Sequence, residues 1–457
     1  MSLPRYPEYK DSGVAWLGEV PAHWEVKRLK LACDIFPSNI DKKSYEDELP
    51  VHLCNYTDVY YNEQITEVID FMPASATKEQ VAKFTLRAGD TIITKDSETS
   101  DDIAIAAYVP RDLPGIVCGY HLSLVRTKPG TDGRYVKRLF DSHYLKSCFE
   151  VLANGLTRVG LSQSALDNVE IPLPESAEQT TIATFLDRET AKIDALVAEQ
   201  EKLLTLLAEK RQATISHSVT KGLNRNAPMK DSGVEWLGDV PAHWRVSRLK
   251  YLVESPNGIQ MGPFGGMLLN LLSDDTGYKV YGQENTISGD FSRGNRWISQ
   301  DRFVELEQYR IQIGDLVLTR KGSLGNARLI SSLPQPGIAD SDTIRLRVNE
   351  ELVLPELLAI LLHEAEYVAR QISVTKRGAI LSGLNTETIA NLAIVCPPLS
   401  EQGYLLESLS AKMASFDAGV IQSTRAIDLL KERRSALIST AVTGKIDVRA
   451  LAEPEAA

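Results

Sequence analysis

Two segments of this chain, 220 positions apart, have almost the same sequence. Residues 10–30 read KDSGVAWLGEVPAHWEVKRLK and residues 230–250 read KDSGVEWLGDVPAHWRVSRLK, so that 17 of 21 positions are identical. A weaker repeat, without gaps, pairs residues 166–220 with residues 389–443. Repeats of this kind predict that one fold is used twice in the chain, because each copy carries the same packing pattern.

The stretches between the repeats differ in sequence but keep a common skeleton. Gly89-Asp90 opens the segment GDTIITK, and Gly314-Asp315 opens the similar segment GDLVLTR. Short runs rich in β-branched and aliphatic residues, bounded by Gly, Pro and Asp, predict strands at 91–94, 103–109, 315–320 and 342–348. Short helices are predicted near 77–84, 134–152 and 355–371. We therefore expect two mixed α/β domains, rich in strands, that share a frame and differ in their surface loops.

Each copy of the weaker repeat predicts a long helix. A strand marked by proline precedes it, at 171–174 and at 394–398, and Ser, Glu and Gln residues suited to a helix start follow. Apolar residues then recur at spacings of three, four or seven over about 40 residues. They are Ile182, Phe185, Leu186, Ile193, Leu196, Leu203, Leu207 and Ile215 in the first copy, and Leu405, Leu409, Phe416, Leu430 and Leu437 in the second. We expect the two helices to form an antiparallel coiled coil with a pseudo-twofold axis, each ending at a glycine, Gly222 or Gly444.

The chain is acidic overall, with a net charge of −11. A stand-alone DNA-binding domain is usually basic, so any DNA contact must come from local patches or be supported by a positively charged partner. The N-terminus lacks a signal-peptide pattern, and no apolar run approaches the roughly 20 residues of a membrane span. The five cysteines are odd in number and far apart, with no CxxC pair. These features favour a protein of the reducing cytoplasm without a zinc site or a disulfide framework.

The sequence carries no complete catalytic motif. It lacks a Walker A loop, the N-P-P-[YF] motif of adenine methyltransferases and the G-x-S-x-G pattern. The segment Glu25-Val26-Lys27 resembles half of a nuclease site, but the second copy has Arg245-Val246-Ser247 at that place. A nuclease carboxylate is not expected to vanish from one copy of so close a repeat. We therefore expect a chain that is not itself an enzyme.

Some basic and hydroxyl side chains follow strands that are predicted at matching places in the two halves of the chain. Others precede matching short helices, which are predicted to start near Ser162 and Ser382. Such side chains can reach guanine edges or phosphates, and helix N-termini favour phosphate. The alternative is that these side chains form an ordinary solvated surface. Because they recur at matched positions in the two halves, DNA contact and a solvated surface both stay open as interpretations. The turn Gly262-Pro263-Phe264-Gly265 either approaches DNA or caps its domain. The candidate DNA-binding residues are Lys95, Ser97, Thr99, Arg158, Arg320, Lys321, Ser323, Lys376 and Arg377.

The nearly identical segments hold four of the five tryptophans: Trp16, Trp24, Trp236 and Trp244. One interpretation is an arm that packs onto its own domain, because tryptophan buries a large apolar area. The other is a docking surface for a partner subunit, because tryptophan is favoured at interface hot spots. Both interpretations hold if one tryptophan of each copy packs inward and the other outward.

The two repeats resemble those of the specificity subunits of type I restriction–modification enzymes. The pattern KDSGVxWLGxVPxHWxVxRLK is similar to the start of their target-recognition domains, and LxNxxIPLPxxxEQ before a long helix is typical of the family. The segment Gly258-Ile-Gln-Met-Gly-Pro-Phe-Gly265 is similar to their domain-opening motif, which the first half of this chain lacks. The resemblance covers essentially the whole chain, in the order recognition domain, helix, recognition domain, helix.

The resemblance implies a non-catalytic subunit of a complex that methylates adenine at N6 and cleaves DNA. Its partners are double-stranded DNA, two methyltransferase subunits and two restriction–translocase subunits. S-adenosylmethionine, ATP and Mg²⁺ belong to those subunits, and this chain is expected to bind no cofactor, metal or membrane. The expected division is 1–175 for target-recognition domain 1, 176–225 for the central helical spacer, 226–398 for target-recognition domain 2, 399–446 for the C-terminal helical spacer and 447–457 for a flexible tail.

Each recognition domain is then expected to read one half of a two-part DNA site, while the helices set the unread gap between the halves. The acidic charge leaves one alternative of another class, a structural adaptor that does not bind DNA. A specificity subunit of a system that only methylates DNA is a further alternative, because cleavage belongs to another subunit.

Overall fold

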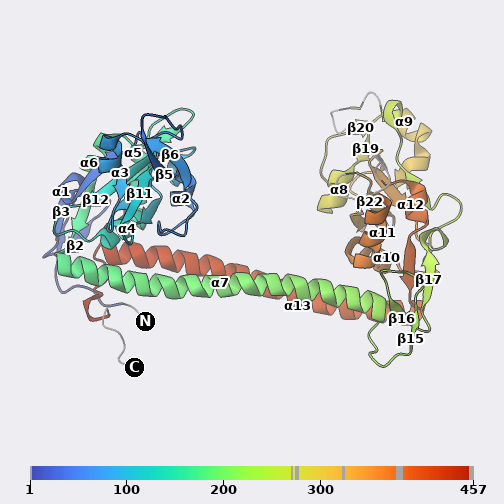
Figure 1. Ribbon diagram of the computed structural model, residues 1–457. Coiled ribbons are helices and arrows are strands. Elements are labelled where there is room, and N and C mark those ends of the chain that lie inside the picture. The colour runs from blue at the N-terminus through green and yellow to red at the C-terminus, as the bar shows by residue number, and fades with distance from the viewer. Residues whose placement is uncertain (1–2, 269–270, 273–276, 322–324, 377–383, 452–457) are drawn as a thin grey trace. The chain divides into compact units, whose positions relative to one another are not determined.

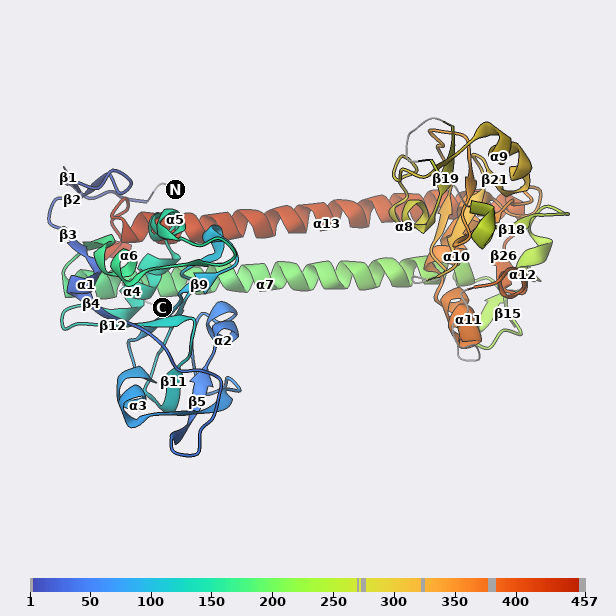
Figure 2. The ribbon, with the colours of Figure 1, turned by 90° about the horizontal axis from the view of Figure 1, so that it is seen from above.

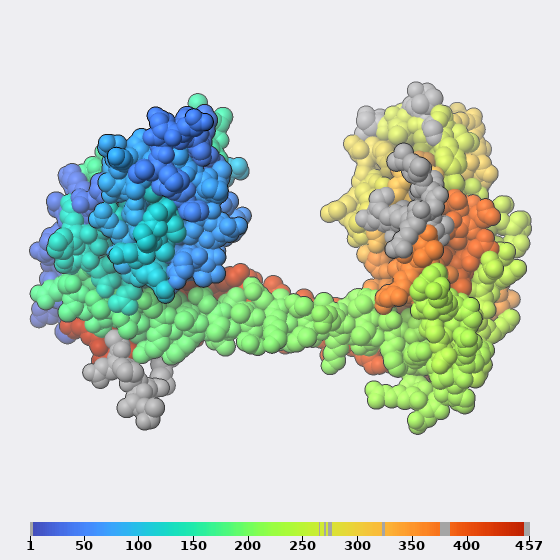
Figure 3. Space-filling model, viewed as in Figure 1, coloured from blue at the N-terminus to red at the C-terminus, as the bar shows by residue number. Residues whose placement is uncertain are grey.

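The computed structural model describes residues 3–268, 271–272, 277–321, 325–376 and 384–451. The chain divides into two compact units, of which unit 1 comprises residues 1–201 and 424–457 and unit 2 comprises residues 202–423 (Figure 1). Each unit contains one copy of the nearly identical segment, the divergent insert that follows it, and part of each of two long helices. Insert residues form most of the visible surface of each unit (Figure 3).

Two four-stranded sheets form the core of the insert in unit 1. The first has the order β10-β8-β12-β4 with antiparallel neighbours, and the second has the order β6-β5-β11-β7 with β5 and β11 parallel. Successive residues of β8 face opposite ways, because Ile93 packs with the helices of the unit and Ile92 packs with the second sheet. The strands are β4 Cys33–Pro37, β5 Leu49–Cys54, β6 Met72–Ala76, β7 Thr85–Leu86, β8 Thr91–Thr94, β10 Ala106–Tyr108, β11 Leu113–Cys118 and β12 Leu122–Thr127.

The helix predicted at 134–152 is in fact two helices, α4 (Gly133–Asp141) and α5 (His143–Leu152). Ser142 between them has an extended backbone, and its hydroxyl accepts a hydrogen bond from the Leu145 amide and so caps α5. A one-residue break leaves the apolar periodicity almost intact, which explains why the sequence predicts one element. The other helices of the insert are α1 Leu29–Ala32, α2 Tyr56–Tyr60, α3 Lys78–Phe84, α6 Gln163–Asn168 and the 3-10 turn η1 Ser100–Asp102.

Unit 2 repeats the two sheets of unit 1, strand for strand. Its orders are β18-β25-β22-β23 and β20-β19-β24-β21, and again the central pair of the second sheet, β19 and β24, is parallel. This common topology confirms that one fold is used twice. The strands are β18 Ile259–Met261, β19 Tyr278–Tyr281, β20 Trp297–Ile298, β21 Arg310–Ile311, β22 Leu316–Thr319, β23 Ala327–Leu329, β24 Gly337–Ala339 and β25 Thr343–Leu346.

The short helix predicted to start near Ser382 in unit 2 begins later. Ser382 lies outside the described residues, and α12 (Thr386–Ala390) is capped by Asn385, whose side chain accepts from the Thr388 amide. Helices α10 (Pro355–Glu364) and α11 (Glu366–Lys376) correspond to α4 and α5 of unit 1. The remaining helical elements are α8 Gln283–Ser288, α9 Gln300–Glu305, η2 Leu249–Tyr251, η3 Gly265–Leu268 and η4 Glu307–Tyr309.

The nearly identical segments fold into matching arms. In unit 1 the arm is the hairpin β1 (Tyr9–Asp11) and β2 (Glu19–Pro21), followed by β3 (Glu25–Arg28), which pairs with β14 (Glu170–Leu173). In unit 2 the same order is β15 (Met229–Asp231), β16 (Asp239–Pro241) and β17 (Arg245–Arg248), which pairs with β26 (Ala393–Cys396). Each arm thereby joins the start of its insert to the strand that precedes a long helix.

The long helices are α7 (Ser176–Lys221) and α13 (Leu399–Val442), and each contributes to both units (Figure 2). Within unit 1, the start of α7 packs on the end of α13, since Ile182 shares a core with Val442, and Arg434 Nε lies 2.8 Å from Asp194 Oδ1. Within unit 2, Ile215 and Leu405 share a core. The two helices therefore run antiparallel in each unit, as predicted.

Two members of the predicted apolar stripe, Leu196 and Leu203, are exposed. A pair of helices buries only a narrow seam, so the wider stripe inferred from spacing is not fully covered. None of the helices in the described ranges is both long and apolar enough to cross a membrane.

The two glycines after the long helices are required by a close approach to the arms. Gly222 follows α7 at φ +73°, and a Cβ added there would lie 3.0 Å from Cζ2 of Trp244. Gly444 follows α13 at φ +71°, and its Cβ would lie 2.2 Å from Cδ of Pro21 and 3.1 Å from Cζ3 of Trp24. The glycine stop signals predicted from the sequence thus also make room for the arm tryptophans.

Part of the predicted flexible tail, 447–457, is packed against unit 1. The Asp447 amide donates to the carbonyl of Pro4, Val448 is fully buried, and the Arg449 guanidinium lies 4.9 Å from the centre of the Tyr6 ring. A 3-10 turn, η5 (Arg449–Leu451), follows. These contacts contradict the tail interpretation for 447–451, and residues 452–457 lie outside the described residues.

Candidate nucleic-acid interface

A surface site of unit 1 is built where β8 ends. Lys95 follows the strand; its amide donates to the carbonyl of His121 and its carbonyl accepts from the amide of Leu161, both at 2.9 Å. The Lys95 ammonium lies 5.7 Å from the centre of the Tyr120 ring. The ring nitrogen Nδ1 of His121 lies 2.8 Å from Asp96 Oδ2. A cation, two aromatic rings and a carboxylate are thus brought together from two segments that are distant in sequence, 95–96 and 120–121.

A short ribbon adjoins this site and brings two more candidates close to it. Strand β9 (Asp96–Ser97) pairs with β13 (Val159–Gly160), which places Arg158, exposed, beside it. Ser97 itself is buried, so it does not point to solvent as the sequence prediction requires. Thr99 is exposed just before η1.

Sequence reasoning missed a row of tyrosines in unit 1. Tyr56 and Tyr60 are four residues apart on α2, and their rings stack at 5.6 Å between centroids, while the highly exposed Tyr61 ring lies edge-on to Tyr60 at 5.0 Å. A hydrogen bond from the Tyr60 hydroxyl to Asp102, at 2.9 Å, raises the pKa of Tyr60. Burial raises the pKa of Tyr56, against the opposing effect of Arg158. The spacing Tyr56–Tyr60 was the available signal, because residues four apart share a helix face.

Unit 2 builds the equivalent site on the same backbone frame with different side chains. The Arg320 amide donates to the carbonyl of Asp342, and its carbonyl accepts from the amide of Leu384, again at 2.9 Å. An aromatic ring again covers the cation, with the Arg320 guanidinium 5.5 Å from the centre of the exposed Phe264 ring. Phe264 comes from the turn that was expected either to approach DNA or to cap its domain.

The two basic residues after β22 differ in exposure. The Arg320 side chain is only 16% exposed and donates to the carbonyls of Leu384, at 3.1 Å, and Ser341, at 3.4 Å. The Lys321 side chain is 53% exposed and lies 2.8 Å from Asp342 Oδ1. Lys321 is therefore the more accessible cation of the pair. Ser323 and Arg377 lie outside the described residues, and of Lys376 the structure describes only its place at the end of α11.

The four repeated tryptophans separate into two kinds. Trp24 and Trp244 are fully buried, so neither can present its ring to a partner, which corrects the docking hypothesis for these two. Trp16 is 58% exposed, and Trp236 is half-buried in a groove of about 410 Å³ lined also by Val374 and Leu392. Trp16 and Trp236 remain candidates for docking.

A carboxylate at the start of each long helix ties the arm to that helix, and the carboxylate of unit 1, Glu178, is buried. His23 Nε2 and His243 Nε2 each lie 2.8 Å from a helix glutamate, Glu178 and Glu401. These matched contacts have a structural role, which accounts for the two repeated histidines. Across the described residues, no group of three or more His, Cys, Asp or Glu side chains is placed to hold a metal ion.

Comparison with known proteins gives consistent matches. The model of the type I restriction modification DNA specificity domain matches residues 21–205. The type I restriction enzyme EcoKI specificity subunit of Escherichia coli (strain K12) is 21% identical over 455 residues, covering 95% of this chain and 92% of that protein.

Two solved chains share the fold. The HsdS subunit from Thermoanaerobacter tengcongensis has a TM-score of 0.56 at 18% identity, and a chain solved in work on complex assembly of the type I R-M system has a TM-score of 0.64 at 17% identity. Each match covers 93% of this chain and 98% of the solved chain. The likeness therefore extends over nearly the full length of the proteins compared.

Proposed function

We propose that this chain, which belongs to the family of type I restriction–modification DNA specificity subunits, reads a DNA site in two halves with one recognition domain for each. The main support is that the two units share one backbone frame and carry different side chains on it. By their backbone hydrogen bonds, Lys95 and His121 in unit 1 stand where Arg320 and Asp342 stand in unit 2. The ring over the cation comes from a different segment in each unit, as Tyr120 or Phe264. Two domains with the same backbone and different side chains are suited to recognise two DNA half-sites of different sequence.

The chemistry of the two sites suits contacts to base edges and phosphates. Arg158 and Lys321 are accessible cations, which can donate to the guanine edge or to a phosphate oxygen. The Tyr60 and Tyr61 rings can pack against sugars or bases, while their hydroxyls offer further polar contacts. The division of the chain into recognition domains at 1–175 and 226–398, with helical spacers at 176–225 and 399–446, is part of this proposal.

The helices and arms would supply the second part of the function. Antiparallel α7 and α13 would set the number of unread base pairs between the half-sites. Exposed Trp16 and half-buried Trp236, one in each repeat, would dock two methyltransferase subunits, and two restriction–translocase subunits would join that complex. Adenine N6 methylation and DNA cleavage would belong to those partners, with their S-adenosylmethionine, ATP and Mg²⁺. A cytoplasmic location and the absence of a cofactor on this chain complete the proposal.

Sequence-specific binding is the property that separates this function from that of an adaptor. The chain, assembled with its methyltransferase subunit, should retard a DNA fragment that carries the site, and a hundredfold excess of unrelated DNA should not compete. Mapping of methyladenine in cells with and without the gene would supply that site. Equal competition by unrelated DNA would favour the structural adaptor, for which the net charge of −11 is the supporting observation.

A further inference from the structure

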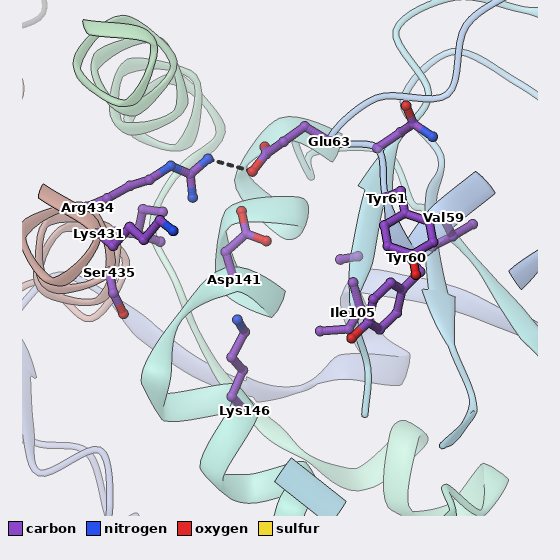
Figure 4. A pocket seen from close by; sticks show the side chains of 13 residues that line it. Val59, Tyr60, Tyr61, Glu63, Ile105, Asp141, Lys146, Lys431, Arg434 and Ser435 are labelled. Carbon is purple, nitrogen blue, oxygen red and sulfur yellow. Dashed lines mark hydrogen bonds and ion pairs between the residues drawn. The ribbon is translucent and has the colours of Figure 1, made fainter. Parts of the chain in front are cut away.

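A cleft of about 340 Å³ opens in unit 1 between the insert and α13 (Figure 4). Its apolar lining includes Ile105 and Ile438, and one wall is formed by Tyr60 and Tyr61 at the end of α2. The opposite wall is formed by Lys431, Arg434 and Ser435, while Asp141 and Lys146 enter from α4 and α5. Polar groups from three directions thus converge on one space.

The carboxylates of this cleft are already neutralised by cations behind them. Asp141 Oδ2 lies 2.7 Å from Lys137 Nζ and 3.2 Å from a guanidinium nitrogen of Arg138. Glu63 is paired with Lys137, Arg138 and Arg434. Each carboxylate is therefore matched within the protein, and neither is expected to repel an anion strongly.

Two lysines of the cleft, by contrast, have no such match. Lys146 and Lys431 are exposed, and within the described part of the chain no carboxylate oxygen lies within 4.0 Å of either ammonium group. Both ammonium groups point toward the cleft in Figure 4. The cleft consequently carries surplus positive charge, although the chain as a whole is acidic.

At the two positions of unit 2 that match these lysines, the chain has alanines. The repeat that pairs 166–220 with 389–443 aligns Lys431 with Ala208. Lys146 is the fourth residue of α5, and the fourth residue of the corresponding helix α11 is Ala369. Arg434, however, is aligned with Arg211, which is paired with Glu364 at 3.2 Å. The structural arginine is thus present in both copies, and the two unmatched lysines are present in one.

We propose that Lys146 and Lys431 together bind a phosphate group of the DNA backbone in this cleft. The inference rests on the proposed DNA-reading function, because Tyr60 belongs both to the cleft and to the tyrosine row of the candidate interface. Lysine suits this task as a compact point charge without a demand for planar geometry. The contact anchors the first recognition domain without regard to base sequence, and the second domain lacks it.

Salt dependence of binding tests this proposal directly. The complex with the methyltransferase subunit would be titrated with its DNA site between 50 and 200 mM salt, for the wild type and for the K146A/K431A double variant. Loss of one phosphate contact should reduce the slope of log K against log salt by about one, with the preferred sequence unchanged. Lys412→Ala, an exposed lysine of α13 in unit 2, is the matched control and should leave the slope unchanged.

Two results would overturn the proposal. One is a double variant that keeps the methyltransferase subunit and shows an unchanged slope. The other is loss of the methyltransferase subunit on gel filtration, which would assign the cleft to a protein partner. Both lysines are exposed, so unfolding of the variant is not expected, and its melting temperature verifies this. A wild-type complex that bound unrelated DNA equally well would instead contradict the proposed function of sequence-specific recognition. In that case, the difference in salt slope between the wild type and the double variant would still test the phosphate contact.

Discussion

At the scale of single residues, two side chains at equivalent backbone positions in the two units need not be equally accessible to a ligand. Lys95 and Arg320 occupy the same place after equivalent strands, but the Arg320 guanidinium is engaged by two backbone carbonyls. Such a largely covered cation with several hydrogen bonds stabilises its loop. The neighbouring cations Arg158 and Lys321 are freer to contact a ligand, and they lie in different units.

We predict that Arg158→Ala and Lys321→Ala each weaken recognition of one half-site only. The expected loss is about 1–3 kcal/mol of binding free energy for a lost base contact, with relaxed specificity at that position. Binding of DNA sites with single-base changes in either half measures this. Each variant serves as the control of the other. If either variant lost the same binding free energy for changes in both half-sites, the assignment of one residue to each half-site would be wrong.

A second residue-scale prediction concerns Glu63. Partial burial alone would raise the pKa of Glu63, but Lys137, Arg434 and Arg138 outweigh it and lower the pKa from 4.5 to about 2. Because the folded pKa lies below the ordinary value, the stabilisation is fully present above pH 4.5 and is lost as the pH falls toward 2. The urea midpoint of Glu63→Gln should therefore lie below that of the wild type at pH 7, with the gap closing in acid. A gap independent of pH would contradict this assignment.

At the scale of elements, the arms and the helix ends form one packing unit. Trp24 lies against Gly444 after α13, and Trp244 lies against Gly222 after α7, so each arm covers the end of a long helix. In unit 1 this brings residues near both ends of the chain together, as the contact of Asp447 with Pro4 also does. The near identity of the two arms follows from this shared packing task.

Separate substitution of Trp24 and Trp16, the two tryptophans of one arm, should distinguish a role in stability from a role in docking. Trp24→Ala should destabilise unit 1 by about 3–5 kcal/mol, because a large buried side chain is removed. Trp16→Ala should change stability by less than about 0.5 kcal/mol and weaken association with the methyltransferase subunit. Urea unfolding and gel filtration measure the two effects. Normal association of the Trp16→Ala variant would exclude this ring as a docking contact.

The sequence predicts most of these elements but not all of the site. Duplication and helical periodicity are visible because they recur, and the structure confirms the common topology and the antiparallel helices. The break at Ser142 is one residue long and hardly disturbs the apolar spacing, and the exposure of Leu196 depends on which neighbours cover it, which spacing does not reveal. The α2 tyrosines lie in a short helix of the divergent insert, so the repeat gave no signal for them. The prediction for Ser97 was wrong because the residue is buried in strand β9, which pairs with β13, a segment distant in sequence.

At the scale of the whole molecule, the central question is what the continuous helices do for two unlike domains. Both α7 and α13 contribute to unit 1 and to unit 2, so a change of their length acts on both units at once. Insertion of seven residues into each helix, near Glu201 and near Ser423, preserves the packing pattern of the pair. It adds about 10 Å at 1.5 Å per residue, or roughly three base pairs.

We therefore predict that the paired insertion lengthens the unread gap of the methylated site by about three base pairs and leaves both half-sites unchanged. Sequencing of methyladenine in cells that carry the variant measures the gap. Insertion into one helix only is the control, and it should disturb the pair and reduce methylation. An unchanged gap in the paired variant would mean that the helices do not determine the spacing.

The most direct test of one reading domain for each half-site is an exchange of the first insert. Residues 33–160, from β4 to β13, would be replaced by the corresponding insert of another family member, leaving the arms and long helices intact. Single-molecule sequencing of methyladenine should then show one half of the motif replaced, with the other half and the gap retained. Replacement of both halves, or of neither, would contradict the account.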